Sequence, residues 1–187
     1  MTKTSVIDGV EYGPLAALVG NWEGDKGLDI APEPDGTEKN PYSETILFEA
    51  IGDVTNAGSQ TLSVLRYHQI VRRKSDNQVF HNETGYWMWD PETDVVMQSL
   101  TIPRGVCLLA GGQAAAGAAT LKVSASVDSK DWGILQSPFM QQNARTTKFD
   151  RSITVKGNQL SYFQTTMLEI YGKTFEHTDA NELTRCK

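Results

Sequence analysis

The sequence predicts an all-β protein, a closed antiparallel up-and-down β-barrel of about ten strands with a short N-terminal helix. Short β-favouring runs recur along the chain, and turn residues separate them at regular intervals. No long helical period follows residue 19, which argues against a parallel α/β architecture. A tryptophan stands in a glycine frame, Gly20-Asn21-Trp22-Glu23-Gly24. Such an opening favours a barrel, because glycines let the first strand bend while the indole plugs the floor.

The first predicted element is a short helix over Val10 to Val19. Leu15 and Leu18 lie at helical spacing, and a proline stands near its start. A loop rich in proline, glycine and aspartate is expected from Pro32 to Pro41. The chain after this loop is predicted to form strands.

Alternation and turn residues define these strands. Leu62 to Arg72 alternates, so that Leu65, Tyr67, Gln69 and Val71 share one face, and a turn at residues 74–77 joins it to the next run as a hairpin. The expected strands are Tyr42–Ile51, Leu62–Arg72, Val79–Trp89, Asp94–Ile102, Val106–Ala110, Thr120–Val127, Thr146–Val155, Gln159–Ile170 and Thr174–Arg185. Lys156-Gly157-Asn158 is a strong hairpin turn between two of them.

Two segments lack a strand pattern. Gly111 to Ala119 is rich in glycine and alanine, and it is predicted to be a mobile loop. Ser129 to Arg145 is the least regular segment, and its large side chains are expected to cap one mouth of the barrel. Those side chains are Trp132, Phe139 and Met140.

Composition bounds the class of protein. The 187 residues suit a single domain, residues 1–187, and the net charge of −6 with a pI near 5.1 argues against a nucleic-acid partner. No secretory signal and no membrane-spanning stretch is apparent. Two cysteines, Cys107 and Cys186, do not make a disulfide framework or a haem-attachment motif, so a cytoplasmic location is expected. The oligomeric state stays open.

Four stretches, in the same order along the chain, resemble the nitrobindin-like haem-binding β-barrels, which are relatives of the lipocalins and fatty-acid-binding proteins. The likeness covers about residues 15 to 185. The stretches are Gly20-x-Trp22-x-Gly24 with Gly27, then Phe80-His81-Asn82-Glu83-Thr84-Gly85-Tyr86-Trp87, then Ile102-Pro103-Arg104-Gly105-Val106, and last Leu160-Ser161-Tyr162 with Met167 and His177. The chain departs from the family pattern after Trp87, where no basic residue follows, and in the spacing of Leu183 and Arg185 after His177.

This resemblance implies a non-covalent b-type haem, ligated in its ferric state by one histidine, which binds nitric oxide and can isomerise peroxynitrite to nitrate. His177 would be the iron ligand. Its second ring nitrogen would donate to Asp179 or to a main-chain carbonyl. From the local sequence alone, a solvent-exposed histidine among polar neighbours is the favoured interpretation of His177, and the resemblance reverses that preference.

Four further residues are candidates for the cavity. His81 shares a strand face with Glu83, so it either contacts a bound diatomic or forms a buried structural network with that carboxylate. Tyr67, Tyr162 and Met167 are expected to line the cavity, although each could be ordinary core. No residue is assigned a catalytic role, because ferric iron would itself supply the electrophile for peroxynitrite.

Two other functions remain open at this stage. The first is a metal-free carrier of a fatty acid or another small apolar molecule, which would need an inward arginine–tyrosine pair to hold a carboxylate. Arg66, Arg72, Arg145 and Arg151 are available, but none lies on a clearly apolar strand face beside a tyrosine. The second is a barrel without a ligand, in which His177 faces water.

Overall fold

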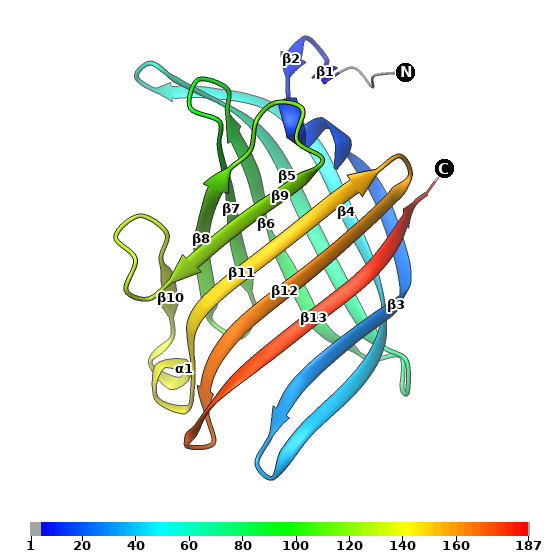
Figure 1. The fold of residues 1–187 in the computed structure, drawn as a ribbon, viewed down its shortest axis with the longest axis vertical. Helices are drawn as coiled ribbons and strands as arrows, with labels where there is room; N and C mark the ends of the chain where they lie inside the picture. Colours follow the sequence, from blue (N-terminus) through cyan, green and yellow to red (C-terminus); the bar gives the residue numbers. More distant parts are fainter. Residues whose placement is uncertain (1–4, 187) are drawn as a thin grey trace.

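The computed structural model describes residues 5–186 and confirms the predicted closed antiparallel barrel of ten strands. Residues 1–4 and 187, the ends of the predicted domain, lie outside the described residues. The chain winds around the barrel with long, strongly tilted strands (Figure 1). In order, the elements are β1 (Val6–Ile7), β2 (Val10–Glu11), the 3₁₀ helix η1 (Gly13–Ala17), β3 (Gly20–Glu33), β4 (Gly36–Ala57), β5 (Gln60–Arg73), β6 (Val79–Asp90), β7 (Val95–Ile102), β8 (Val106–Gln113), β9 (Thr120–Ser126), β10 (Ile134–Gln136), α1 (Pro138–Asn143), β11 (Ala144–Lys156), β12 (Gln159–Ile170) and β13 (Lys173–Arg185).

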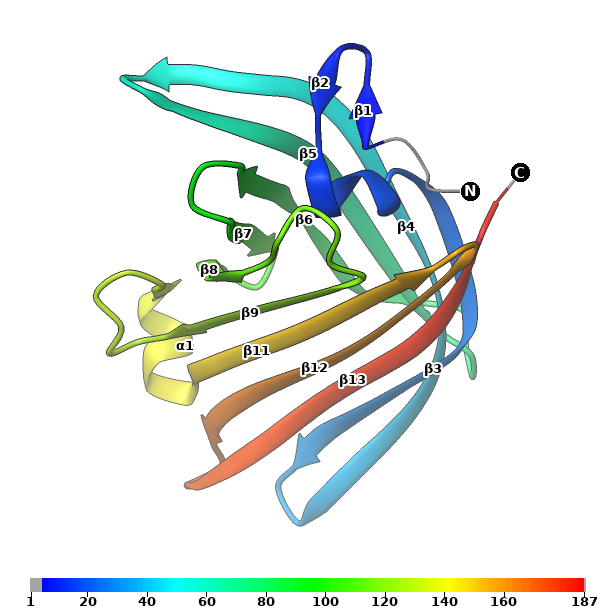
Figure 2. The same ribbon diagram turned by 45° about the horizontal axis from the view of Figure 1, so that its top comes forward.

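Sequential hairpins run through most of the wall. The strand order is β10-β8-β7-β6-β5-β4-β3-β13-β12-β11-β9. The ten strands from β8 to β9 form the ring, which closes where Gly111 of β8 pairs with Ser124 of β9, and β10 is an additional strand paired with β8. β3 and β13 lie side by side although they are at opposite ends of the sequence (Figure 2). This pairing brings the first long strand of the chain against the last one.

The tryptophan predicted to plug the floor of the barrel, Trp22, lies beside the end of η1. Its side chain is fully buried, and its indole N–H donates to the main-chain oxygen of Leu18 at 2.6 Å. The guanidinium of Arg185 stacks over the indole at 4.0 Å. The predicted helix is present only as η1 with β2 before it, and Gly13 at the start of η1 has a positive φ of 49°. A Cβ at Gly13 would lie 2.5 Å from the ring of Trp89. Close packing, more than helical propensity, therefore shapes this segment.

The first of two predicted loops is wrong, and the second is a loop over residues 114–119 but strand over residues 111–113. The segment Pro32 to Pro41 is mostly strand, since β3 and β4 continue to a turn at residues 34–35. The segment Gly111 to Ala119 begins inside β8, where a Cβ at Gly112 would lie 2.0 Å from the main-chain oxygen of Lys122. Here glycine permits the close approach of two strands that closes the barrel.

The least regular predicted segment forms β10 and α1 beside one end of the barrel (Figure 1). Ser137 caps α1 by accepting from the main-chain N–H of Met140 at 3.3 Å. Met140 is buried, whereas Phe139 is exposed, and the ring of Trp132 lies against Gly111. Among the described residues, no helix is both long enough and apolar enough to cross a membrane.

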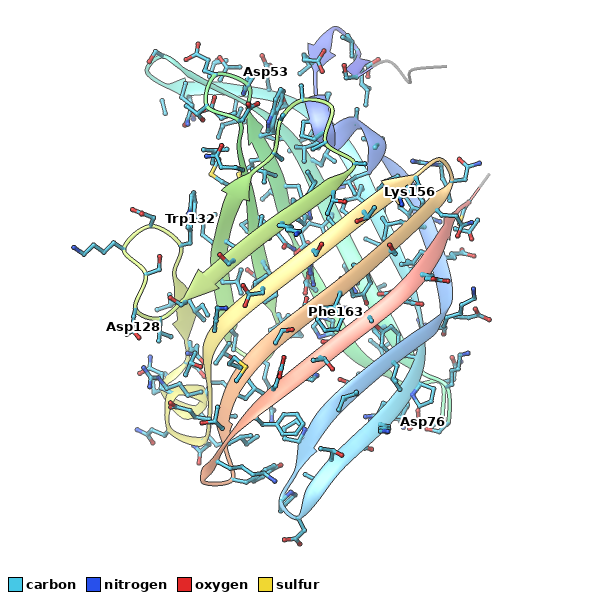
Figure 3. The ribbon with its side chains drawn as sticks, in the orientation of Figure 1. Asp53, Asp76, Asp128, Trp132, Lys156 and Phe163 are labelled. Carbon is cyan, nitrogen blue, oxygen red and sulfur yellow. The ribbon has the colours of Figure 1, made fainter. Side chains whose placement is uncertain are left out.

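Alternation along the strands separates the interior from the outer surface. On β12, Tyr162 and Gln164 are buried while Phe163 is exposed on the outer wall (Figure 3). On β5, the predicted inward face is confirmed by the burial of Tyr67 and Gln69. This period-2 pattern fixes which side chains can reach a ligand inside the barrel.

Candidate ligand cavity

A cavity of about 340 Å³ lies inside the barrel and receives side chains from nine strands and from α1. Its volume falls within the ordinary range for small-molecule sites, about 300–1,000 Å³. Most of the exposed wall is apolar, and the polar groups gather at a few places. The apolar wall includes Val71, Phe80, Leu100, Ile102, Leu108 and Phe149.

His177 of β13 lines this cavity and is held by a carboxylate from β3. Its Nε2 atom lies 2.5 Å from Oδ1 of Asp29 and 3.7 Å from Oδ2 of Asp179. The second oxygen of Asp29 accepts from the side-chain amide of Asn40 at 2.9 Å. Asp29 is buried, whereas about a quarter of the His177 side chain is exposed. Asp29 therefore orients the imidazole of His177, and Asn40 in turn orients Asp29.

The electrostatics of this group follow from burial and proximity. Burial alone would lower the pKa of His177, but the hydrogen bond to Asp29 and the charges of Asp179 and Asp29 raise it above its usual value. Burial raises the pKa of Asp29, yet the hydrogen bonds from His177 and Asn40 bring it below its usual value. Burial and the neighbouring Asp29 raise the pKa of Asp179 to about 6, although the charge of His177 opposes them. One ligand atom from each of the three residues lies within 4.8 Å of the others, so the group could also hold a cation.

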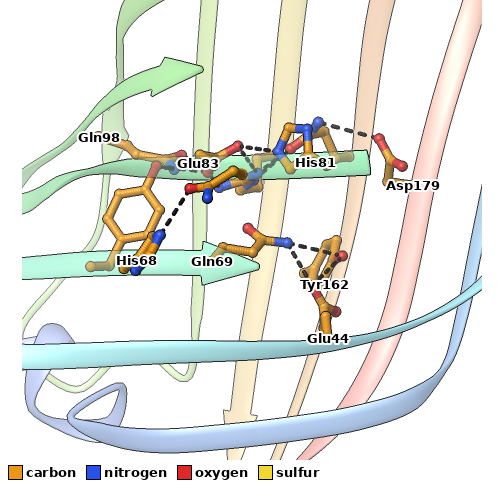
Figure 4. A network of polar contacts seen from close by, with 12 residues as sticks. Glu44, His68, Gln69, His81, Glu83, Gln98, Tyr162 and Asp179 are labelled. Atoms are coloured by element: carbon orange, nitrogen blue, oxygen red, sulfur yellow. Dashed lines mark hydrogen bonds and ion pairs between the residues drawn. The ribbon is translucent and has the colours of Figure 1, made fainter. Parts of the chain in front are cut away.

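A second polar network centres on Glu83, beside the cavity (Figure 4). Glu83 is fully buried and forms an ion pair with Arg151, with N–O distances of 2.7 and 3.1 Å. The hydroxyl of Tyr67 donates to Glu83 at 2.7 Å, and Nε2 of His81 lies 3.3 Å from it. Burial alone would raise the pKa of Glu83, but the charge of Arg151 and the hydrogen bond with His81 lower it to about 2. Glu83 is therefore a carboxylate at neutral pH.

Glu44 of β4 is a third buried carboxylate, and it has no cationic hydrogen-bond partner among the described residues. Its oxygens accept from Gln69 at 2.6 Å, from Asn181 at 2.7 Å and from the Tyr162 hydroxyl at 3.1 Å. Figure 4 shows Gln69 and Tyr162 converging on it. Burial raises the pKa of Glu44 to about 7, although these hydrogen bonds and the charge of Arg151 oppose the rise.

This raised pKa predicts that stability changes near neutral pH. Because Glu44 binds its proton more tightly in the folded protein than in the unfolded chain, where the value is 4.5, unfolding free energy should fall as pH rises from about 4.5 to about 7. In wild type the unfolding free energy should fall by about 3 kcal/mol over this pH range, and Glu44→Gln should abolish the fall. Urea unfolding at pH 5 and pH 8 measures it, with the exposed Glu49→Gln as control. Equal pH dependence in wild type and Glu44→Gln would contradict the prediction.

The structure brings His177, His81 and Tyr162 together on the cavity wall. His81 lines the cavity and contacts Glu83, so the predicted network with that carboxylate is present, and its contact with a bound diatomic stays a prediction. Tyr67 does not line this cavity, and its hydroxyl donates to Glu83. Met167 does not line the cavity, since it shares the outer parity of Phe163 on β12.

Two site residues escaped the sequence analysis. Arg151 is buried beside Tyr162, so the statement that no arginine lies on an apolar face near a tyrosine is wrong. Its alternation with Phe149 and Ile153 was a usable signal, because all three side chains point inward. Asp29 carried no such signal, because an irregularity in the β3–β4 register between residues 24 and 27 disturbs the alternation before it.

Comparisons with known proteins give a match to a family model and matches to solved structures. The sequence model of the "THAP4-like, heme-binding beta-barrel domain" matches residues 11–185. The crystal structure of Rv2717c from M. tuberculosis is similar in fold, with a TM-score of 0.66 and 24% identity over 92% of this chain and 95% of that chain. No curated protein matches the sequence.

Proposed function

Because the chain belongs to the family of THAP4-like, heme-binding β-barrel domains, we propose that it binds haem non-covalently in the barrel cavity with His177 as the iron ligand. The observation that carries the proposal is the position of this imidazole. It lines an apolar cavity and is oriented by a buried carboxylate. A ligand histidine of a metal site characteristically has its other ring nitrogen bonded to a carboxylate or carbonyl.

The residues present fit a porphyrin bound through histidine. An imidazole has two ring nitrogens, and the carboxylate of Asp29 occupies only one of them. Among residues 5–186, the other nitrogen of His177 has no hydrogen-bond partner. The surrounding wall is mainly aliphatic and aromatic, which suits a flat apolar macrocycle. In this proposal Asp29, in place of Asp179 or a main-chain carbonyl, is the partner of the ring nitrogen that does not bind iron.

The finer part of the proposal concerns the ligand of the haem. Bound ferric haem would supply an electrophilic iron that accepts nitric oxide or peroxynitrite. His81 is the cavity residue suited to donate a hydrogen bond to such a guest, since burial lowers its pKa but Glu83 raises it overall. Tyr162 is held to Tyr42 by a hydroxyl–hydroxyl contact of 2.6 Å and shapes the wall. We propose peroxynitrite isomerisation as the reaction.

The alternative, a metal-free carrier of a fatty acid, has one feature in its favour. Arg151 lies 5.9 Å from the ring of Tyr162, and both line the cavity. The same guanidinium, however, already pairs with Glu83 and donates to Gln164. A fatty-acid carboxylate bound to this guanidinium would have to displace a buried carboxylate, which costs several kcal/mol. The pair of Arg151 and Tyr162 therefore does not support the carrier.

A titration of the purified protein with ferric haem tests the proposed function. We expect a saturable Soret band at a stoichiometry of one haem per chain, and faster decay of peroxynitrite to nitrate in the presence of the loaded protein. A parallel titration with a fluorescent fatty acid separates the two functions. Saturable fatty-acid binding together with no saturable Soret band would reject haem in favour of the carrier.

Asp29 should control how strongly the imidazole binds iron. Asp29→Asn keeps the shape of the side chain but removes the charge that polarises the ring N–H, so ferric haem affinity should fall by about tenfold. Asp179→Asn is the matched control, because it removes a nearby charge that lies 3.7 Å away without the short contact. Competition with apomyoglobin measures both affinities. An equal loss in the two variants would mean that only the net charge matters.

A further inference from the structure

Two arginines line the cavity, and they differ in how fully they are paired. The guanidinium of Arg151 is almost completely buried, and both of its ends are bonded to Glu83 and Gln164. It has little capacity left for a ligand. Arg73, at the end of β5, is the second arginine of the wall and has a different environment.

Arg73 is held in place and yet is only partly satisfied. Its guanidinium lies 5.5 Å from the centre of the Phe80 ring, and Phe80 also lines the cavity. One terminal nitrogen contacts Asp76 at 3.2 Å, and both side chains of that pair are about one-third exposed. The Nε atom of Arg73 is buried and has no hydrogen-bond partner among the described residues. A buried guanidinium N–H without an acceptor is costly, so a ligand acceptor that reached it would stabilise the protein.

The main chain of Arg73 adds to this preorganisation. Its N–H donates to the main-chain oxygen of Gln78 at 3.0 Å, and its oxygen accepts from the N–H of Asn77 at 2.8 Å. The turn between β5 and β6 therefore fixes the base of the side chain, and Phe80 fixes its plane. A planar guanidinium that is already oriented loses little entropy when it binds a carboxylate.

The charges in the rest of the cavity give a ligand carboxylate one favourable position. Asp29, Asp179, Glu83 and Glu38 line the wall, and they repel an anion. The other cationic or titratable bases of the wall, His177, His81 and Arg151, each contact one of these acids. An anionic group on a ligand would therefore lie beside Arg73, and the apolar body of the ligand would lie against the aliphatic and aromatic wall.

We propose that Arg73 is a specificity-determining residue that binds a carboxylate of the cavity ligand. The inference rests on the proposed function, in which the ligand is haem and the carboxylate is one of its propionates. It makes the preferred ligand class amphipathic and acidic: a flat apolar body with a carboxylate at its edge. Phe80 and Asp76 position the guanidinium for this contact.

Haem and its dimethyl ester provide the test, because they share the macrocycle and iron but differ in the propionate charges. The affinity of each is measured by quenching of tryptophan fluorescence for wild type, Arg73→Gln, Arg73→Lys and Arg72→Gln. Arg72 is the matched control, since it is an exposed arginine that does not line the cavity. We expect wild type and Arg72→Gln to prefer haem over the ester by about fivefold, the effect of a partly exposed ion pair.

Arg73→Gln should bind the two compounds equally, and Arg73→Lys should keep part of the preference. Equal binding of both compounds by wild type, or an unchanged preference in Arg73→Gln, would overturn the inference while leaving haem binding intact. So would a loss in Arg73→Gln that is the same for both compounds, because that would indicate altered packing. If wild type binds neither compound, the proposed function itself fails.

Discussion

Replacing His177 with alanine should weaken ferric haem binding by more than about a hundredfold and abolish the spectrum of a histidine-ligated haem. Loss of a residue that only orients a metal ligand already costs about 10–100-fold, so loss of the ligand itself should cost more. The other side chains near it, Asp29 and Asp179, are carboxylates that already accept hydrogen bonds from Asn40 and Gln164. They do not replace an imidazole at a ferric iron.

Absorption and resonance Raman spectra of the reconstituted protein measure this loss. His68→Ala is the matched control, because His68 is exposed on the outer face of β5 and contacts Asn82 at 2.8 Å. Its spectrum should equal that of wild type. Added imidazole should restore the ligated spectrum to His177→Gly, which a merely unfolded variant would not permit. A wild-type spectrum in His177→Ala would rule out this residue as the iron ligand.

Glu83→Gln should lower the free energy of unfolding by about 3–5 kcal/mol, because it leaves the charge of Arg151 buried without its counter-ion. Both side chains are almost completely buried, and two hydrogen bonds join them. The substitution preserves side-chain volume, so the loss reports charge and hydrogen bonding and not a cavity. Chemical denaturation followed by tryptophan fluorescence measures it.

Two comparisons sharpen this prediction. Glu49→Gln, which breaks the exposed pair with Arg66, should cost less than about 1 kcal/mol. Combining Glu83→Gln with Arg151→Gln should recover part of the loss, because no lone charge then remains buried. Since the pKa of Glu83 is lowered to about 2 from 4.5, its contribution should be present above about pH 4.5 and lost as pH falls through about 2. A cost of Glu83→Gln no larger than that of Glu49→Gln would contradict the account.

The strand pattern could be predicted from the sequence because burial alternates along most of the wall. The side chains of Leu65, Tyr67 and Gln69 are buried as their spacing indicates, and the hairpin turn at Gly157 has the positive φ of 63° that glycine favours. The errors fell on segments where local composition suggests a loop. Gly111 and Gly112 serve close strand approach instead, and that depends on a partner strand and on Trp132.

The partners in the candidate site could not be predicted in the same way. His177 was identified through its place in a family-like motif, whereas Asp29, the residue that holds its ring, lies 148 positions away. Glu83 and Arg151 are 68 positions apart, on strands that are not neighbours in the sheet. Nothing in the spacing of either pair indicates a contact, because the closure of the barrel determines both.

The sequence by itself determined that this chain is a barrel and, for most of its strands, which face points inward, since period-2 burial is a local property. The tertiary structure alone decided which inward polar groups meet. Pairing of the first long strand with the last one brings Asp29 to His177, and the curvature of the wall brings Arg151 to Glu83. Charged side chains inside a closed barrel interact across its interior. The distance between two of them depends on how the sheet closes and not on their separation in the sequence.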